Sequence, residues 1–430
     1  MVARSRGPWA GRARAVATMS FAGYALLTFA CKPDLVGRPS TIDEDVVLAI
    51  RSFPAEVKPD DSPPPVVTYE ALYVGPEGAI DSSGMDWAFC DQSKPLAVTG
   101  PIAPACLVRR AADITVSVSS GADGAAPMTE TRHVLTPFGN GLSASSPPPA
   151  DGCRVFGPFP PDPVSGQPQA RPADPDTTGG YYQPVRLLVP TRTGDQFAVG
   201  ITRLDCGIAG ATPDQATEYS KRHRPNQNPA LLSLVVTHAN GRRDTVPPEP
   251  GGSPAAQTAR DAGMASDGGD SASSDGGIPT LEAGASRGDS GVPSTDAGAP
   301  STDAGSVEPV TVSQGESVVF RATWAACAAA CNGSSCPPPK PCTGSESYVN
   351  LDLTARQLVD HRESIRISWF SSDGAFDHDR TGRGESDANR PSSDNAWTAP
   401  ATTTDVHLWV VIRDDRGGVG WSTYVIHVTS

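Results

Sequence analysis

Apolar and polar residues alternate with a period of two in many short segments of this chain. In 66–74, "VVTYEALYV", every second residue from Val67 to Tyr73 is apolar. In 405–413, "DVHLWVVIR", the same holds from Val406 to Ile412. Alternation of this kind, bounded by Pro, Gly and Asp, is typical of antiparallel strands that bury one face. The pattern predicts further strands at 46–54, 84–90, 114–119, 181–189, 195–206, 231–236, 316–324, 363–371 and 421–428.

One short helix is expected between the strands. Thr212 can cap its N-terminus, Pro213 suits its first position, and Gln215 lies three residues after the cap. Together they form a capping box. We therefore predict an all-β protein with one short helix, built from two immunoglobulin-like β-sandwich domains at residues 44–228 and 229–430.

Two long segments interrupt the strand pattern. Residues 121–180 are rich in proline, which cannot pair within a central strand, so we expect a long surface excursion from the first domain. Residues 246–308 contain no aromatic side chain and repeat "PSTDAGA" as "PSTDAGS". Such a composition buries too little apolar surface to offset chain entropy, so we predict a disordered insertion in the second domain.

The N-terminal residues form a separate unit. Four arginines precede an apolar stretch at 15–30, and this is the pattern of a secretory signal peptide occupying residues 1–30. The end of the stretch, "LLTFAC", is similar to the lipobox of bacterial lipoproteins, in which the cysteine becomes the lipidated N-terminus. We expect lipid attachment at Cys31 and a polar tether at 31–43, with simple cleavage after Ala30 as the alternative.

The overall charge narrows the choice of partners. The formal net charge is −14 and the pI is about 4.9. A chain this acidic is poorly suited to binding phosphate backbones, which argues against nucleic acid. We expect contact with the membrane through the N-terminal lipid anchor, at the periplasmic or the surface face of the outer membrane, and an unknown protein or glycan partner.

The nine cysteines support export into an oxidising compartment. If Cys31 carries the lipid, eight remain, an even number that suits disulfides. The candidates are Cys90, Cys106, Cys153, Cys206, Cys327, Cys331, Cys336 and Cys342. Cys90 and Cys106 are close enough in sequence to staple a loop, and Cys153 with Cys206 would pin the proline-rich excursion.

Four of these cysteines fall within "CAAACNGSSCPPPKPC". Four thiolates can hold structural zinc, but these spacings lack the paired CxxC elements of a zinc ribbon. We therefore expect disulfides. Of the three possible pairings we favour Cys327 with Cys342 and Cys331 with Cys336.

Several blocks resemble known proteins. "VVLAIRSFPAEVKPDD", "VTYEALYVGPEG" and "ATEYSKRHRPNQNPAL" resemble blocks of uncharacterised secreted lipoproteins that are common in myxobacteria. The C-terminal region also resembles bacterial immunoglobulin-like and PKD-like modules, which combine a tryptophan strand, a W-x-A-P element and a D-x-x-G-G hairpin. The matching residues are Trp369, Gly374, Trp397, Ala399, Pro400, Asp414, Gly417 and Gly418. The resemblance implies a fold and a location, and it carries no catalytic residues.

One acidic loop is a candidate metal site. Asp373, Asp377 and Asp379 lie within "SSDGAFDHDRTG", and calcium needs several oxygens at close range. The loop lacks the D-x-D-x-D-G pattern and the distal glutamate of a calcium loop. A solvated loop between strands is therefore the favoured interpretation, and we expect no cofactor.

The segment "WVVIRDDRGGVGW", 409–421, places two aspartates between two arginines. We interpret it as the turn of a β-hairpin rather than a catalytic acid pair, because Asp and Gly both suit tight turns. On the flanking strands, Trp409 and Trp421 can form an aromatic strip that binds sugars beside His407 and His427.

These observations predict a cell-envelope lipoprotein that is not an enzyme. A structural or adhesive module is the leading hypothesis, because β-sandwiches present binding loops on a rigid scaffold. One alternative is a carbohydrate-binding accessory protein. A second alternative is a hydrolase whose active site is assembled from residues far apart in sequence.

Overall fold

The computed structural model describes residues 39–80, 84–94, 100–109, 116–118, 130–132, 134–158, 176–191, 194–249, 309–329 and 341–430. They lie in one compact unit, Pro39–Ser430, which is mostly β-sheet. No helix within these ranges is long and apolar enough to cross a membrane. The predicted signal peptide, Cys31, and nearly all of the predicted disordered insertion lie outside the described residues.

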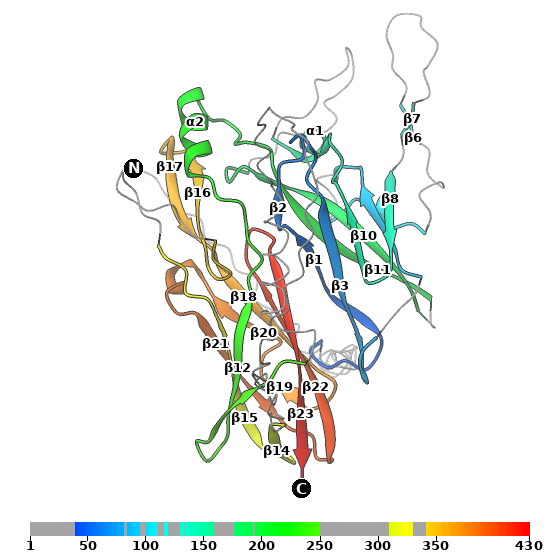
Figure 1. The fold of residues 1–430 in the computed structure, drawn as a ribbon, viewed down its shortest axis with the longest axis vertical. Helices are drawn as coiled ribbons and strands as arrows, with labels where there is room; N and C mark the ends of the chain where they lie inside the picture. The colour runs from blue at the N-terminus through cyan, green and yellow to red at the C-terminus, as the bar shows by residue number, and fades with distance from the viewer. Residues whose placement is uncertain are drawn as a thin grey trace, which may run out of the picture. The chain divides into compact units, whose positions relative to one another are not determined.

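Four large sheets carry the fold (Figure 1). Sheet I has the order β1 (Val46–Phe53), β3 (Val67–Gly75), β4 (Gly78–Ala79), with β9 (Ser143–Ser146) also paired to β3. Sheet II has the order β2 (Glu56–Val57), β11 (Gly194–Asp205), β10 (Gly180–Thr191), β5 (Asp86–Cys90), β8 (Leu135–Asn140).

The other two large sheets come from the C-terminal half of the chain. Sheet III has the order β14 (Thr311–Ser313), β23 (Val419–Thr429), β22 (Thr404–Arg413), β18 (Ile365–Ser371), β20 (Arg380–Arg383). Sheet IV has the order β13 (Arg243–Val246), β12 (Leu231–Thr237), β15 (Ser317–Trp324), β21 (Ser392–Thr398), β19 (Ala375–Phe376).

The smaller elements complete the described fold. Two-stranded sheets are formed by β16 (Ser347–Asp352) with β17 (Gln357–Arg362) and by β6 (Val116–Val118) with β7 (Glu130–Arg132). The helices are α1 (Gly152–Phe156), α2 (Pro213–Arg222) and the 3-10 turns η1 (Pro104–Cys106) and η3 (Glu385–Asp387).

Sheet I is covered on both faces. Tyr69 of β3 packs with Trp87 of β5 and Val185 of β10 in a core between sheets I and II. On the opposite face, Leu72 of β3 packs with Trp409 of β22 in a core between sheets I and III. Sheet I therefore joins the N-terminal and C-terminal halves of the described chain.

A third core lies between sheets III and IV. It includes Phe320 of β15, Trp369 of β18 and Leu408 of β22. The four large sheets therefore stack in the order II, I, III, IV, with one apolar core in each gap. Two of the sheets curl like half-barrels.

The prediction that each strand buries one face is wrong for strands at the junction of sheets I and III. On β22, Leu408 and Val410 face sheet IV, whereas Trp409 and Val411 lie beneath sheet I. A second sheet covers the face that was expected to meet solvent. The uninterrupted apolar run from Leu408 to Ile412 is the local signal of a strand buried on both faces.

The proline-rich stretch 121–180 is not wholly a surface excursion. Its middle part forms β8, which pairs with β5, and β9, which pairs with β3. β8 accommodates Pro137 because it is the edge strand of sheet II, where a missing N–H breaks no ladder. Residues 159–175 of this stretch lie outside the described residues.

The predicted helix is confirmed as α2. Thr212 Oγ1 accepts a hydrogen bond from the N–H of Gln215, and the Gln215 side chain accepts one from the N–H of Thr212. The buried face of α2 carries Tyr219, which packs against Val349 and Leu351 of the β16–β17 hairpin. The alternation pattern did not predict this hairpin.

Candidate functional site

Three disulfides are present in the described residues. They join Cys90 to Cys106, Cys153 to Cys206 and Cys327 to Cys342, which are the pairings expected from the sequence. The last bond removes two of the four thiolates that a zinc site in this cluster would need. Cys331 and Cys336 lie outside the described residues. Three disulfides indicate an extracytoplasmic protein.

The candidate calcium ligands do not gather around a common point. Asp373, Asp377 and Asp379 are all exposed. Oδ1 of Asp373 accepts a hydrogen bond from the N–H of Gly374, at 2.6 Å, as in a solvated turn. Within the described ranges, no group of three or more His, Cys, Asp or Glu side chains is arranged to hold a metal ion.

The hairpin predicted around Asp414 and Asp415 is confirmed. β22 and β23 pair antiparallel up to Arg413 and Val419. Between them Gly417 has a φ of 99°, which favours glycine. Asp415 is exposed, whereas Asp414 is buried.

The aromatic strip suggested for sugar binding does not face solvent. Trp409 is 0% exposed in the core between sheets I and III, and the half-buried Trp421 packs against the same core. The guanidinium of Arg51 lies 4.3 Å from the ring centroid of Trp421. His407 stacks on Trp409 with ring centroids 6.0 Å apart. The interpretation of the two tryptophans as a sugar platform is therefore wrong.

A buried cluster of charges lies between sheet II and the β22–β23 turn of sheet III, and Glu56 of β2 is at its centre. Oε2 of Glu56 lies 2.9 Å from Nη2 of Arg416 and 3.2 Å from Nε of Arg203. Its Oε1 lies 3.2 Å from Nε2 of His223. Burial alone would raise the pKa of Glu56, but His223, Arg203 and Arg416 outweigh burial and lower it to about 2. Glu56 is therefore a permanent negative charge among basic side chains.

Arg416, from the turn between β22 and β23, connects this cluster to the C-terminal half. Its Nη2 donates to the carbonyl of Arg224 at 2.8 Å, and its Nη1 lies 3.4 Å from Oε1 of Glu363. The guanidinium also lies 5.3 Å from the ring centroid of Tyr348. One side chain thus contacts the segment before β12, the segment before β18 and strand β16.

Three further carboxyl groups surround Arg416. Oδ1 of Asp414 accepts hydrogen bonds from the N–H groups of Arg416 and Gly418, at 2.9 and 2.7 Å. Burial nevertheless raises the pKa of Asp414 to about 6 and that of Glu346 to about 7. Burial and the charge of Asp414 raise the pKa of Glu363 well above its usual range.

The charged residues of the cluster are largely buried, although Asp414 also lines an open cavity. None of its six charged residues, Glu56, Arg203, Glu346, Glu363, Asp414 and Arg416, exposes more than 8% of its surface. A general acid or base must come within hydrogen-bonding distance of a substrate. This geometry suits a junction that fixes sheets against one another better than it suits a reaction centre.

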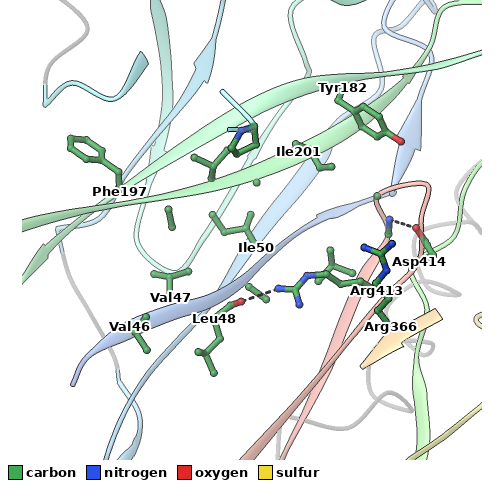
Figure 2. A pocket seen from close by; sticks show the side chains of 18 of the residues that line it. Val46, Val47, Leu48, Ile50, Tyr182, Phe197, Ile201, Arg366, Arg413 and Asp414 are labelled. Atoms are coloured by element: carbon green, nitrogen blue, oxygen red, sulfur yellow. Dashed lines mark hydrogen bonds between the residues drawn. The ribbon is translucent and has the colours of Figure 1, made fainter. Parts of the chain in front are cut away.

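An open cavity of about 590 Å³ adjoins the cluster (Figure 2). Strand β1 contributes Val46, Val47 and Leu48, and strand β11 contributes Phe197 and Ile201. The opposite wall is formed by the polar residues Arg366, Arg413, Asp414 and Asp415. The volume is in the range of sites for small organic molecules.

Arg413 enters this cavity from the end of β22. Figure 2 shows its side chain extended toward β1, where Nη2 donates to the carbonyl of Leu48 at 2.9 Å. Its Nη1 lies 3.4 Å from Oγ of Ser368. Burial, together with the charge of Arg380, lowers the pKa of Arg413.

Sequence reasoning missed both the charge cluster and the cavity. A partial signal was present, since Arg203 lies within the apolar run of "FAVGITRLDC", where a buried charge requires a partner. Nothing local to Glu56 or Glu363 distinguishes them from exposed acids. Their partners come from distant parts of the chain.

Comparisons with known proteins add little to this geometry. No protein-family model and no curated protein matches the chain. Among solved structures, the chain is similar to dimeric latent PorU from Porphyromonas gingivalis, with 10% identity and a TM-score of 0.16. The match covers 91% of this chain and 24% of that protein, so the chain spans about a quarter of its length. A TM-score this low carries no argument about fold or function.

Proposed function

We propose that this chain is an exported, lipid-anchored protein of the cell envelope that acts as a non-enzymatic structural or binding module. Its three disulfides support an oxidising location. The lipobox-like sequence before Cys31 supports the anchor. A mature lipoprotein cysteine carries more than one acyl chain, which gives firmer anchoring than a single chain.

We also propose that sheets III and IV form an immunoglobulin-like β-sandwich. What supports this is the strand order. In sheet IV, β12, β15, β21 and β19 follow the A-B-E-D order, and in sheet III, β18, β22 and β23 follow the C-F-G order. β14 runs parallel to β23 at the edge of sheet III.

The observation that carries the functional proposal is the buried charge cluster around Arg416. The acids with raised pKa values, Asp414, Glu346 and Glu363, are held by backbone N–H groups and by Arg416 inside the protein. Together with the pair of Arg416 and Glu56, these contacts join sheet II to the β22–β23 hairpin of sheet III, and they hold the acids in a largely buried position. Such a junction suits a scaffold for surface loops.

Purified Cys31→Ala protein can be tested for both activity and binding. We expect no turnover of ester, glycoside, peptide or phosphoester substrates, and saturable co-sedimentation with peptidoglycan sacculi or with outer-membrane vesicles. Turnover that is abolished by Asp414→Asn or His223→Gln would overturn the proposal in favour of a hydrolase. Absence of binding to every envelope fraction would overturn the adhesive role.

The anchor is tested separately by membrane fractionation. We expect the wild-type chain to partition with the outer membrane and the Cys31→Ala chain to be released. If both chains are equally soluble, the cysteine is not lipidated, and simple cleavage after Ala30 becomes the better interpretation.

A further inference from the structure

Two arginines lie side by side in one wall of the open cavity. Arg366 of β18 and Arg413 of β22 are direct partners in the antiparallel ladder. Side chains of such partners lie on the same face with their Cβ atoms about 4.5–5.5 Å apart, and like charges in this arrangement destabilise a sheet. Arg380 adds a third positive charge close enough to lower the pKa of Arg413.

The buried arginines elsewhere in the protein are paired differently. Among the described residues, the fully buried arginines Arg186, Arg203 and Arg416 each form an ion pair with a carboxylate. The half-buried Arg413 instead donates to the neutral oxygens of Leu48 and Ser368. A partly desolvated cation without an anionic partner is costly.

In the part of the chain that the structure describes, neither Arg366 nor Arg413 forms an ion pair with a carboxylate. Asp414 and Asp415 also line the cavity, but both are engaged elsewhere. Asp414 accepts backbone hydrogen bonds within the turn. Oδ2 of Asp415 accepts the N–H of Ser364 at 3.2 Å. The wall therefore holds two guanidinium groups that form no ion pair within the described residues.

The facing wall is apolar. It is formed by Val46, Val47 and Leu48 of β1 together with Phe197 and Ile201 of β11 (Figure 2). Phe197 is 37% exposed, so part of a large apolar ring is open to a ligand. A molecule that fills this space contacts the two guanidinium groups at one end of the cavity and apolar side chains in the rest of it.

We propose that this cavity binds an amphipathic organic carboxylate, with the carboxylate between Arg366 and Arg413 and the apolar portion against Val46, Val47 and Phe197. A planar guanidinium matches a carboxylate through two parallel hydrogen bonds, and a charge-assisted pair of this kind is about twice as strong as a neutral one. The ligand also relieves the repulsion between the two arginines. The inference rests on the proposed binding role and names its ligand class.

The test uses four probes with the same ten-carbon chain, measured by calorimetric titration of the Cys31→Ala protein. They are decanoate, decyl phosphate, decanol and decyltrimethylammonium. We expect decanoate to bind most tightly, decanol at least tenfold more weakly, and the cationic probe not at all. Tighter binding of decyl phosphate would overturn the assignment of a carboxylate, and equal binding of the cationic probe would overturn the anion site.

Substitutions then locate the site. Arg413→Met and the exposed Arg366→Gln should each weaken decanoate binding at least about tenfold, the effect of losing one charge-assisted contact. Arg390→Gln, at an exposed residue between η3 and β21 and outside the cavity lining, is the matched control and should bind within about twofold of wild type, since its charge is screened by solvent. Thermal unfolding confirms that each variant is folded, and Arg366→Gln keeps the test valid if Arg413→Met is unstable. Unchanged binding in both cavity variants would overturn the site.

The outcomes separate this inference from the proposed function. If no anionic probe binds but the protein still co-sediments with envelope material, only the ligand assignment fails. If decanoate binds as expected but no envelope fraction is bound, the adhesive role fails and the cavity assignment stands.

Discussion

Nη2 of Arg416 donates a hydrogen bond of 2.9 Å to Oε2 of Glu56, although 360 positions separate the two residues in the chain. Each side chain is at most 2% exposed. The pair ties the turn of the β22–β23 hairpin to strand β2. Other charges at the junction are arranged around it.

Arg416→Met should destabilise the fold strongly. The substitution removes one of the basic partners of Glu56 and the ion-pair partner of Glu363. Breaking a buried ion pair costs about 3–5 kcal/mol. Guanidinium denaturation followed by tryptophan fluorescence measures the loss. Arg380→Met, on an exposed site, should cost less than about 0.5 kcal/mol. Equal stability of the two variants would mean that the cluster contributes little to the junction.

The raised pKa values of Glu346 and Asp414 predict that stability falls as the pH rises toward neutrality. Their ordinary values are 4.5 and 3.8, and the folded values are about 7 and about 6. The folded state therefore binds protons more tightly than the unfolded state, and this contribution is full below about pH 4 and lost by about pH 7. Glu56 acts oppositely, since its folded pKa of about 2 adds stability that is lost only as the pH falls below 4.5.

The combined effect is a stability maximum near pH 5. We expect the free energy of unfolding at pH 5 to exceed that at pH 8 by an amount on the order of a few kcal/mol. Glu346→Gln, which imitates the protonated acid, should reduce this difference. Glu218→Gln, exposed on α2, should leave it unchanged. A pH profile identical in wild type and Glu346→Gln would show that Glu346 is not the titrating group.

The disulfides should differ in their contributions. Cys153 and Cys206 are 53 positions apart, and Cys90 and Cys106 are 16 apart. In the chain-entropy model, the longer loop is worth about 4 kcal/mol and the shorter about 3 kcal/mol. Paired Cys→Ser variants, compared by urea denaturation, should preserve that order. Peptide mapping under non-reducing conditions checks the pairings, and a different partner for Cys327 would contradict the structure.

Trp409 should be a packing residue rather than a ligand contact. Trp409→Ala removes a fully buried ring from the core between sheets I and III, so we expect a loss of about 3–5 kcal/mol. Leu232→Ala, at a residue 62% exposed, is the control and should be nearly neutral. A Trp409→Ala protein of wild-type stability that has lost binding to a glycan array would restore the sugar-strip interpretation.

Features with local signals were predictable from the sequence. The capping box of α2 involves residues three positions apart, and the turn after Arg413 is set by Asp and Gly within five residues. Disulfide pairing followed from sequence proximity for Cys90 with Cys106, and for Cys327 with Cys342 it was the favoured one of three pairings within a short cluster. In each case the determining contacts lie close together in the chain.

The stacking of sheet I on sheet III could not be predicted in the same way. Alternation says which residues share a face, but it does not say what covers that face. The local sequence around Glu56 and around Arg416 does not indicate that these residues are buried, because the residues that surround them come from strands that are distant in sequence. The cavity is lined by the same distant strands, so the sequence could not predict it either.

The dependence of β1 and β2 on the β22–β23 hairpin has a consequence during export. Secretion threads a chain from its N-terminus, so Ala49 and Glu56 emerge more than 350 residues before their partners Trp409 and Arg416. Until then the apolar face of sheet I that later packs on sheet III is exposed to water, and Glu56 lacks the guanidinium of Arg416 as a partner. If the chain is exported as proposed, arrest of translocation before Trp409 should leave sheet I open to protease cleavage.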